Sequence, residues 1–92
     1  MDFTGLNLWM IKLVTVVNGA VGKGRSQLHA WHKAGVTPDK EALSSYLQIA
    51  MCEYQPELNG CAILTSEDRE HLTLALAGIL ISVLDAETGE KN

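Results

Sequence analysis

The run LTLALAGILISVL, residues 72–84, is the most apolar stretch of the chain and decides its fold. Wound as a helix, its apolar side chains cover more than half of the circumference and leave only a narrow polar strip. Such a helix has to be covered on two sides, so we expect it to be the central element of a bundle or a helix shared between subunits. The face expected to be buried carries Leu72, Leu76, Ile79, Leu80, Val83 and Leu84, whereas Leu74 and Ile81 fall outside that face.

The length of 92 residues allows one domain, which we place at residues 1–92 with a frayed tail at residues 88–92. A core of this size is modest, so a second copy or a partner would help to stabilise it. The apolar fraction of 47% is ordinary for a globular protein and argues against disorder.

Charge is unevenly distributed along the chain, whose formal net charge is −4. Residues 1–38 hold four Lys and Arg residues against Asp2, whereas residues 39–92 hold three against ten acids. The halves can neutralise one another by folding together, which we favour, or one half can face an oppositely charged partner. The acidic total disfavours a dedicated DNA-binding protein, which carries a strong basic excess.

A first amphipathic helix is predicted from about Thr4 to Val21. Its β-branched residues leave a strand over Ile11–Val17 as the alternative, although two-residue alternation is poor there. Leu8 and Ile11 lie in the polar arc of this helix, so it has apolar surface beyond its core face.

Two further helices are indicated by their capping residues. Thr37-Pro38-Asp39 combines a capping threonine with proline at the first helical position, and the helix that follows ends before Pro56. Residues 55–64 form a loop by composition, with a short extended piece at residues 61–64. Thr65 or Ser66 then caps the last helix, which ends at residue 89.

These elements predict an all-α domain: a helical hairpin or small bundle of three long helices, the first of them kinked. The predicted core draws on all three helices and comprises Trp9, Leu13, Val17, Leu43, Leu47, Ala50, Tyr54, Leu72, Leu76, Ile79, Leu80 and Val83.

The kink is placed in the Gly-rich stretch NGAVGKGRS, residues 18–26. Each glycine inside a helix costs ~1 kcal/mol relative to alanine. Gly19, Gly22 and Gly24 therefore predict a break or sharp kink, after which a short helix resumes at Ser26 and is closed by Gly35.

The same stretch is the candidate ligand site. Backbone N–H groups of a Gly-rich loop and of a helix N-terminus can bind an anion, and basic side chains add charge. The candidate anion-binding residues are Gly22, Lys23, Gly24, Arg25, Ser26, His29 and Lys33. With Trp31 as a stacking surface, the stretch could instead follow a phosphate backbone. The Walker and dinucleotide-binding patterns are both absent, so a hinge between helices is the competing interpretation.

No catalytic or metal site is indicated. His29 and His32 could share a helix face, and the other histidine or the cysteines could complete a site, but no ligand spacing specifies a metal. The acids form no metal-binding helix pattern, and no nucleophile lies beside a base. We therefore expect no enzyme activity, no metal and no cofactor.

Two cysteines are too few for a disulfide scaffold, so Cys52 and Cys61 are expected to be reduced, with a bridge between them as the alternative. The start of the chain fits a signal peptide poorly, because Asp2 is the only charge before its apolar run. The run at residues 72–84 is shorter than the about 20 residues that span a bilayer. A cytoplasmic protein without a membrane partner is predicted.

The sequence therefore predicts a non-enzymatic interaction protein that binds another macromolecule through a helical surface, as adaptors, antitoxins and phage-type inhibitors do. Apolar residues outside the core faces predict a homo-oligomer, with Leu8, Ile11, Leu74 and Ile81 as candidate interface residues. The alternative is a small protein that binds a nucleotide or a nucleic acid through residues 22–33.

Overall fold

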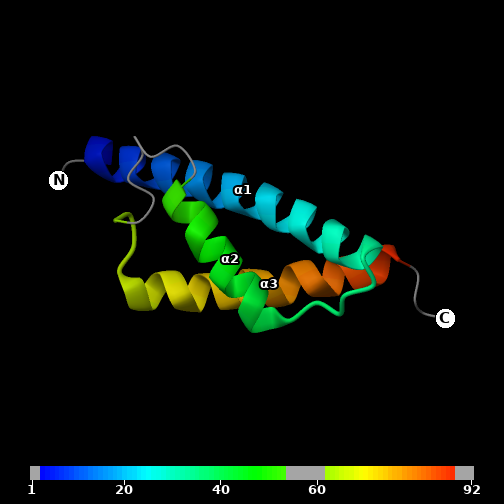
Figure 1. Ribbon diagram of the computed structural model, residues 1–92. Helices are drawn as coiled ribbons and strands as arrows, with labels where there is room; N and C mark the ends of the chain where they lie inside the picture. The colour runs from blue at the N-terminus through cyan, green and yellow to red at the C-terminus, as the bar shows by residue number, and fades with distance from the viewer. Residues whose placement is uncertain (1–2, 54–61, 89–92) are drawn as a thin grey trace.

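Three packed helices form the protein in a computed structural model that describes residues 3–53 and 62–88, with side chains from Asn7 onward. They are α1 (Phe3–Lys33), α2 (Lys40–Glu53) and α3 (Ser66–Glu87), and each contacts the other two. α1 and α3 run in the same direction and converge at their C-terminal ends, while α2 crosses obliquely between them (Figure 1). The predicted all-α bundle of three long helices is confirmed.

The end of α1 is fixed by Gly35, whose φ of 75° lies in the left-handed region that glycine adopts without strain. The Val36 N–H donates to the Trp31 carbonyl at 2.9 Å, and the Gly35 N–H donates to the His32 carbonyl at 3.1 Å. These two bonds make a Schellman motif, so carbonyls at the end of the helix find donors in the turn. The prediction that Gly35 closes this helix is confirmed.

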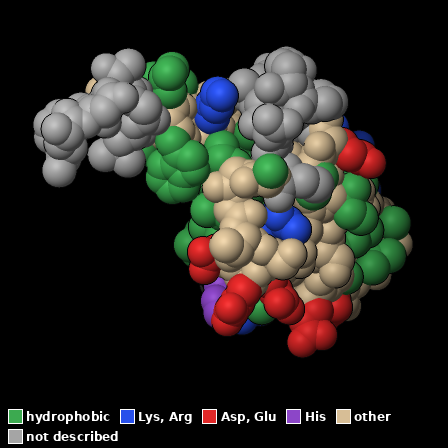
Figure 2. Space-filling view, turned by 90° about the vertical axis from the view of Figure 1, so that its left-hand side faces the viewer, with side chains coloured by type: hydrophobic (Ala, Val, Ile, Leu, Met, Phe, Trp, Pro, Cys, Tyr) green, Lys and Arg blue, Asp and Glu red, His purple; other side chains and the backbone are tan. Residues whose placement is uncertain are grey.

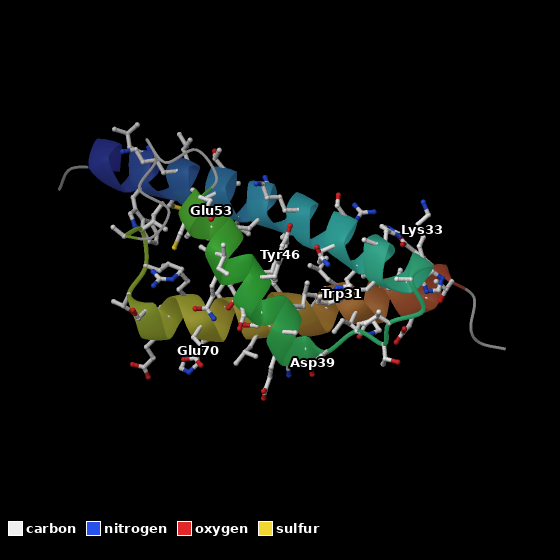
Figure 3. The ribbon with its side chains drawn as sticks, in the orientation of Figure 1. Trp31, Lys33, Asp39, Tyr46, Glu53 and Glu70 are labelled. Atoms are coloured by element: carbon white, nitrogen blue, oxygen red, sulfur yellow. The ribbon has the colours of Figure 1, made fainter. Side chains whose placement is uncertain are left out.

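The other two helices are capped at their N-termini by side chains. Asp39 rather than Thr37 caps α2: its Oδ2 accepts from the Ala42 N–H at 3.0 Å, and the helix begins at Lys40 (Figure 3). A carboxylate is a good cap that also complements the helix dipole. Thr65, one of the two predicted candidates, caps α3 by accepting from the Asp68 N–H at 3.1 Å. Residues 62–64, the described part of the predicted extended piece, form a turn and bends instead.

α1 runs without a break through residues 18–26, so the predicted interruption there is not found, and the strand alternative over Ile11–Val17 is wrong. Gly24 is buried where α1 crosses the other helices. A Cβ atom placed on it would lie 2.7 Å from Leu47 Cδ2 and 3.3 Å from Leu80 Cδ1. Glycine is thus needed for the close approach of the helices, and this packing outweighs its low helix propensity.

The core lies where the three helices cross. α1 contributes positions spaced by four residues, so one ridge of this helix faces its neighbours. The buried apolar side chains are Val16, Ala20 and Leu28 from α1, Leu43, Leu47, Ala50 and Met51 from α2, and Ala77, Leu80 and Leu84 from α3.

Three residues predicted for the core are exposed: Trp9 by 41%, Ile79 by 58% and Val83 by 42%. The Trp9 Nε1–H donates to the Ile63 carbonyl at 3.2 Å, which ties α1 to the segment before α3. Four others are half-buried, namely Leu13, Val17, Leu72 and Leu76, and Tyr54 lies outside the described residues.

The exposure of Ile79 and Val83 follows from the rotation of α3, which turns Thr73 and Ala77 toward the core. Thr73 can be buried because its hydroxyl lies 2.9 Å from the Arg69 carbonyl and 2.9 Å from the Ser44 hydroxyl of α2. A small or internally satisfied side chain lets a neighbouring helix come close, whereas a large aliphatic side chain holds it away.

Cys52, near the end of α2, is disulfide-bonded. The expectation of reduced thiols is therefore wrong for this residue. The sequence contains one other cysteine, Cys61, which lies outside the described residues.

Candidate functional site

The Gly-rich stretch does not form the anion-binding loop that the sequence suggested. Gly24 is buried beneath Leu47 and Leu80, whereas Gly22 is exposed with no heavy atom near its Cβ position. Because α1 is continuous, the backbone N–H groups of this stretch bond to carbonyls four residues earlier and are not free for a ligand. The helix N-terminus expected at Ser26 is likewise absent, since this residue lies inside α1.

The polar and charged residues of the stretch stay on the surface of α1. Lys23, Ser26, His29 and Lys33 are all exposed. Arg25 lies 3.9 Å from Glu87 Oε2, a long contact between half-exposed groups that contributes little. Lys33 and His32 occupy the last turn of α1, where positive charge complements the helix dipole.

Trp31 is half-buried and packs against the core between the helices (Figure 3). A cavity between the C-terminal halves of α1 and α3 is lined by Arg25, His29 and Leu84 among others and measures only about 10 Å³. That space suits about one water molecule. The candidate residues therefore share one helix without enclosing a ligand site.

Metal ligands do not gather in the part of the chain that the structure describes. Across residues 3–53 and 62–88, no three His, Cys, Asp or Glu side chains lie close enough together to hold an ion. His29 and His32 are both exposed on α1, and the Cys52 sulfur is engaged in its disulfide.

The N-terminal part of α1 exposes large apolar side chains in several directions; we name residues 7–14 the α1 tip. Ile11 is 61% exposed and Leu8 is 53% exposed, and Trp9, Met10 and Val14 are exposed beside them. The α1 tip projects from the body of the molecule and displays mainly apolar side chains (Figure 2). Leu8 and Ile11, two predicted interface residues, thus lie on the most prominent apolar surface of the described chain.

A second apolar surface follows the outer side of α3. It is an open groove of about 580 Å³, which we name the α3 groove, lined by Leu74, Ala75, Gly78, Ile79, Ser82, Val83 and Ala86 with Lys40 of α2 at its edge. Leu74, a predicted interface residue, lines this groove and is half-buried. Ile81, the fourth, packs against the core instead.

Ile79 and Val83 are the surface residues that sequence reasoning missed, because both were assigned to the core. Their hydrophobicity gave no sign of exposure. The available signal was Thr73 with Ala77, a pair of small residues four apart that marks a close helix crossing.

The comparisons with known proteins provide no assignment of function. No helix in the described ranges has both the length and the apolarity needed to cross a membrane. No protein-family model, no curated protein and no solved structure matches this chain.

Proposed function

We propose that the protein is a non-enzymatic interaction protein that associates with other macromolecules, and first with itself, through the α1 tip. The observation that carries this proposal is the run of exposed apolar side chains at Leu8, Trp9, Met10, Ile11 and Val14. Adaptors, antitoxins and phage-type inhibitors act in this way, by occupying a surface on another molecule.

The number and proximity of these side chains distinguish them from ordinary surface residues. Single exposed apolar residues are common on soluble proteins, but a contiguous patch usually marks an interface. Covering such a patch releases about 25 cal/mol per Å² of apolar surface removed from water. Because the side chains point in several directions around α1, a binding surface that wraps the helix covers more of them than a flat one.

The alternative of nucleotide or nucleic-acid binding through residues 22–33 has weaker support. Its basic side chains are exposed, but Gly24 is buried and the backbone of the stretch is helical. The chain also has a formal net charge of −4, which opposes binding to phosphate backbones.

The predicted cytoplasmic location stays a prediction. Disulfides persist in oxidising compartments and are rare in the cytosol, so the bond at Cys52 argues against that location. The redox state of Cys52 in protein purified from its native source decides between the cytosol and an oxidising compartment.

The experiment that tests the proposal is light scattering of the intact chain and two variants between 5 and about 200 μM, a range typical of weak to moderate self-association. The wild-type protein should have at least twice the 10.0 kDa mass of the monomer. Ile11→Glu places a charge on the α1 tip and should give a monomer. Val36→Glu is the matched control, because Val36 is exposed by 48% in the turn that follows the C-terminal end of α1.

Both variants change an exposed side chain, so circular dichroism should show unchanged helicity. A wild-type mass of one chain at every concentration would exclude self-association. A variant Ile11→Glu that associates like the wild type would exclude the α1 tip as the contact surface.

A further inference from the structure

We infer that the α1 tip inserts into the surface of a lipid bilayer, with its apolar side chains among the acyl chains and the body of the molecule outside in water. This inference goes beyond the proposed self-association, which uses the same side chains, so that one α1 tip is either in a dimer or in lipid. It departs from the sequence-based expectation of no membrane partner. That expectation considered segments that cross a bilayer, whereas an inserted tip enters only one face of it.

The α1 tip is open to solvent on all sides. The six consecutive residues 7–12 are all exposed, and they make more than one turn of a helix with about 3.6 residues per turn. Four of the six are large and apolar, with exposed fractions from 41% for Trp9 to 61% for Ile11. Among the described side chains of α1, the first buried one is Val16. A whole apolar turn of this helix is therefore left uncovered by the body of the molecule (Figure 2).

Exposure on all sides favours a lipid surface over a protein surface. A neighbouring helix or a flat protein surface covers one side of a helix, and covering the remaining sides requires a pocket of matching shape. Acyl chains are fluid and fill the space around an inserted side chain whatever its shape. Leu8, Met10 and Ile11 point in different directions, because successive side chains turn by about 100° around a helix. Lipid covers all three at once without a complementary surface.

The polar groups of the α1 tip suit the boundary between headgroups and acyl chains. Lys12 is its only charged residue, and a lysine can extend its ammonium group to the headgroups while its methylene stem lies among apolar groups. Trp9 combines an apolar ring with a polar N–H, the combination that enriches tryptophan at membrane interfaces. Residues 7–14 contain no acid, so insertion takes no carboxylate out of water.

The backbone of the α1 tip is already paired. Because α1 begins at Phe3, the N–H of Asn7 and of each following residue in the helix bonds to the carbonyl four residues earlier. Unpaired backbone groups would be costly in hydrocarbon. At a rise of about 1.5 Å per residue, residues 7–14 extend over about 12 Å, comparable to the depth of about 5–10 Å that interfacial helices reach.

A shallow and reversible attachment follows from the size of the α1 tip. The four large apolar residues among residues 7–12 keep about half of their surface exposed and together resemble one acyl chain in apolar size. A single myristoyl chain binds membranes with a constant of about 10⁴ M⁻¹. We therefore expect half of the protein to be bound at about 0.1–1 mM accessible lipid.

Flotation of the full chain with phosphatidylcholine vesicles tests the inference, since these vesicles carry no net charge. At about 1 mM lipid the wild type should float equally well at low and high salt, because burial of apolar side chains is not screened. Ile11→Glu should lower the bound fraction about tenfold, because a carboxylate then has to leave water. Ile79→Glu is the matched control: its side chain is 58% exposed on α3, outside the α1 tip, and its flotation should equal that of the wild type.

Vesicles with brominated acyl chains identify the inserted residue, because bromine quenches the fluorescence of a tryptophan only where the two are in contact. Trp9 should be quenched, whereas Trp31, near the other end of α1, should not. Trp9→Phe keeps an apolar ring at the α1 tip, so this variant should still float but should lose the quenching.

Circular dichroism should show the same helicity in the wild type and in all variants. A wild type that dimerises in buffer but does not float overturns the inference and leaves the proposed function standing. Flotation of Ile11→Glu equal to that of the wild type, flotation that is lost at high salt, or quenching that persists in Trp9→Phe also overturns it. A monomeric wild type that floats, together with an Ile11→Glu variant that does not, supports insertion and excludes self-association.

Discussion

Gly22 and Gly24 lie two residues apart on α1, yet a methyl group added at each meets a different environment. At Gly22 the Cβ position has no heavy atom within 4 Å, whereas at Gly24 it lies 2.7 Å from Leu47 Cδ2. Leu47 is fully buried and cannot move aside freely. A substitution at Gly22 therefore tests helix propensity alone, whereas the same substitution at Gly24 also tests core packing.

We predict that Gly22→Ala stabilises the protein and that Gly24→Ala destabilises it. In Gly22→Ala, the loss of backbone freedom in the unfolded chain should add about 0.5–1 kcal/mol. In Gly24→Ala, overpacking against Leu47 and Leu80 should exceed this gain and leave a net loss of about 1 kcal/mol. Urea denaturation of both variants measures the difference, and equal stabilisation by both would show that the helices do not approach at Gly24.

Cys52 gives a second prediction at the scale of one residue. Because it is disulfide-bonded, Cys52→Ser should lower the free energy of unfolding by about 2–3 kcal/mol under oxidising conditions. With reductant, the wild type should fall to the stability of the variant. Thermal unfolding with and without reductant measures this effect. Alkylation of both thiols in native wild-type protein, seen as a mass shift, would contradict it.

At the scale of the element, α3 shows which features can be read from sequence. Its existence and its cap at Thr65 follow from local patterns: a long apolar run and an N-terminal signal. Its buried face does not follow, because the rotation of a helix that is apolar nearly all round is set by its neighbours. Ile79 and Val83 were assigned to the core since large aliphatic side chains are usually buried, and the small pair Thr73 and Ala77 took that place instead.

The register of α2 on α3 depends on the buried hydroxyl pair Ser44–Thr73, whose oxygens lie 2.9 Å apart. Thr73 Oγ1 also lies 2.9 Å from the Arg69 carbonyl and 3.1 Å from the Glu70 carbonyl, to which it donates its one proton. While Thr73 donates to a carbonyl, Ser44 is the donor within the pair; either hydroxyl can donate there.

We therefore predict that Thr73→Val costs about 1–3 kcal/mol of stability, because it leaves the Ser44 donor without its acceptor, and that Ser44→Ala costs about 0.5–1.5 kcal/mol. The double variant should be no less stable than Thr73→Val alone, since no buried donor is then left unpaired. Denaturant unfolding of the wild type, the two single variants and the double variant completes a double-mutant cycle. Strictly additive losses would contradict the coupling between the two hydroxyl groups.

At the scale of the whole molecule, the sequence predicted two exposed residues of the α1 tip, Leu8 and Ile11, but not the groove. Leu8 and Ile11 could be recognised because they lie in the polar arc of a clearly amphipathic helix. The groove depends on how α3 is rotated, which only the packed structure shows. The predicted break at residues 18–26 is not found for a related reason: the helix propensity of glycine does not reveal the close crossing at Gly24.

Because folding and self-association are linked in the proposed dimer, its melting temperature should depend on protein concentration. Each tenfold increase in concentration stabilises a dimer by about 1.4 kcal/mol, or about 0.7 kcal/mol per chain. For a chain of this size that corresponds to a rise of about 3–6 °C. Differential scanning calorimetry of the wild type at low and high micromolar concentrations measures it.

The variant Ile11→Glu supplies the control for this last prediction. It should melt at the same temperature at all concentrations, because its folded state is a single chain. At low concentration it should also melt close to the wild type, since the side chain at position 11 is 61% exposed and makes little contribution to the monomer core. A wild-type melting temperature that does not change with concentration would mean that the α1 tip stays uncovered in the folded protein. That outcome would contradict the proposed linkage between folding and self-association.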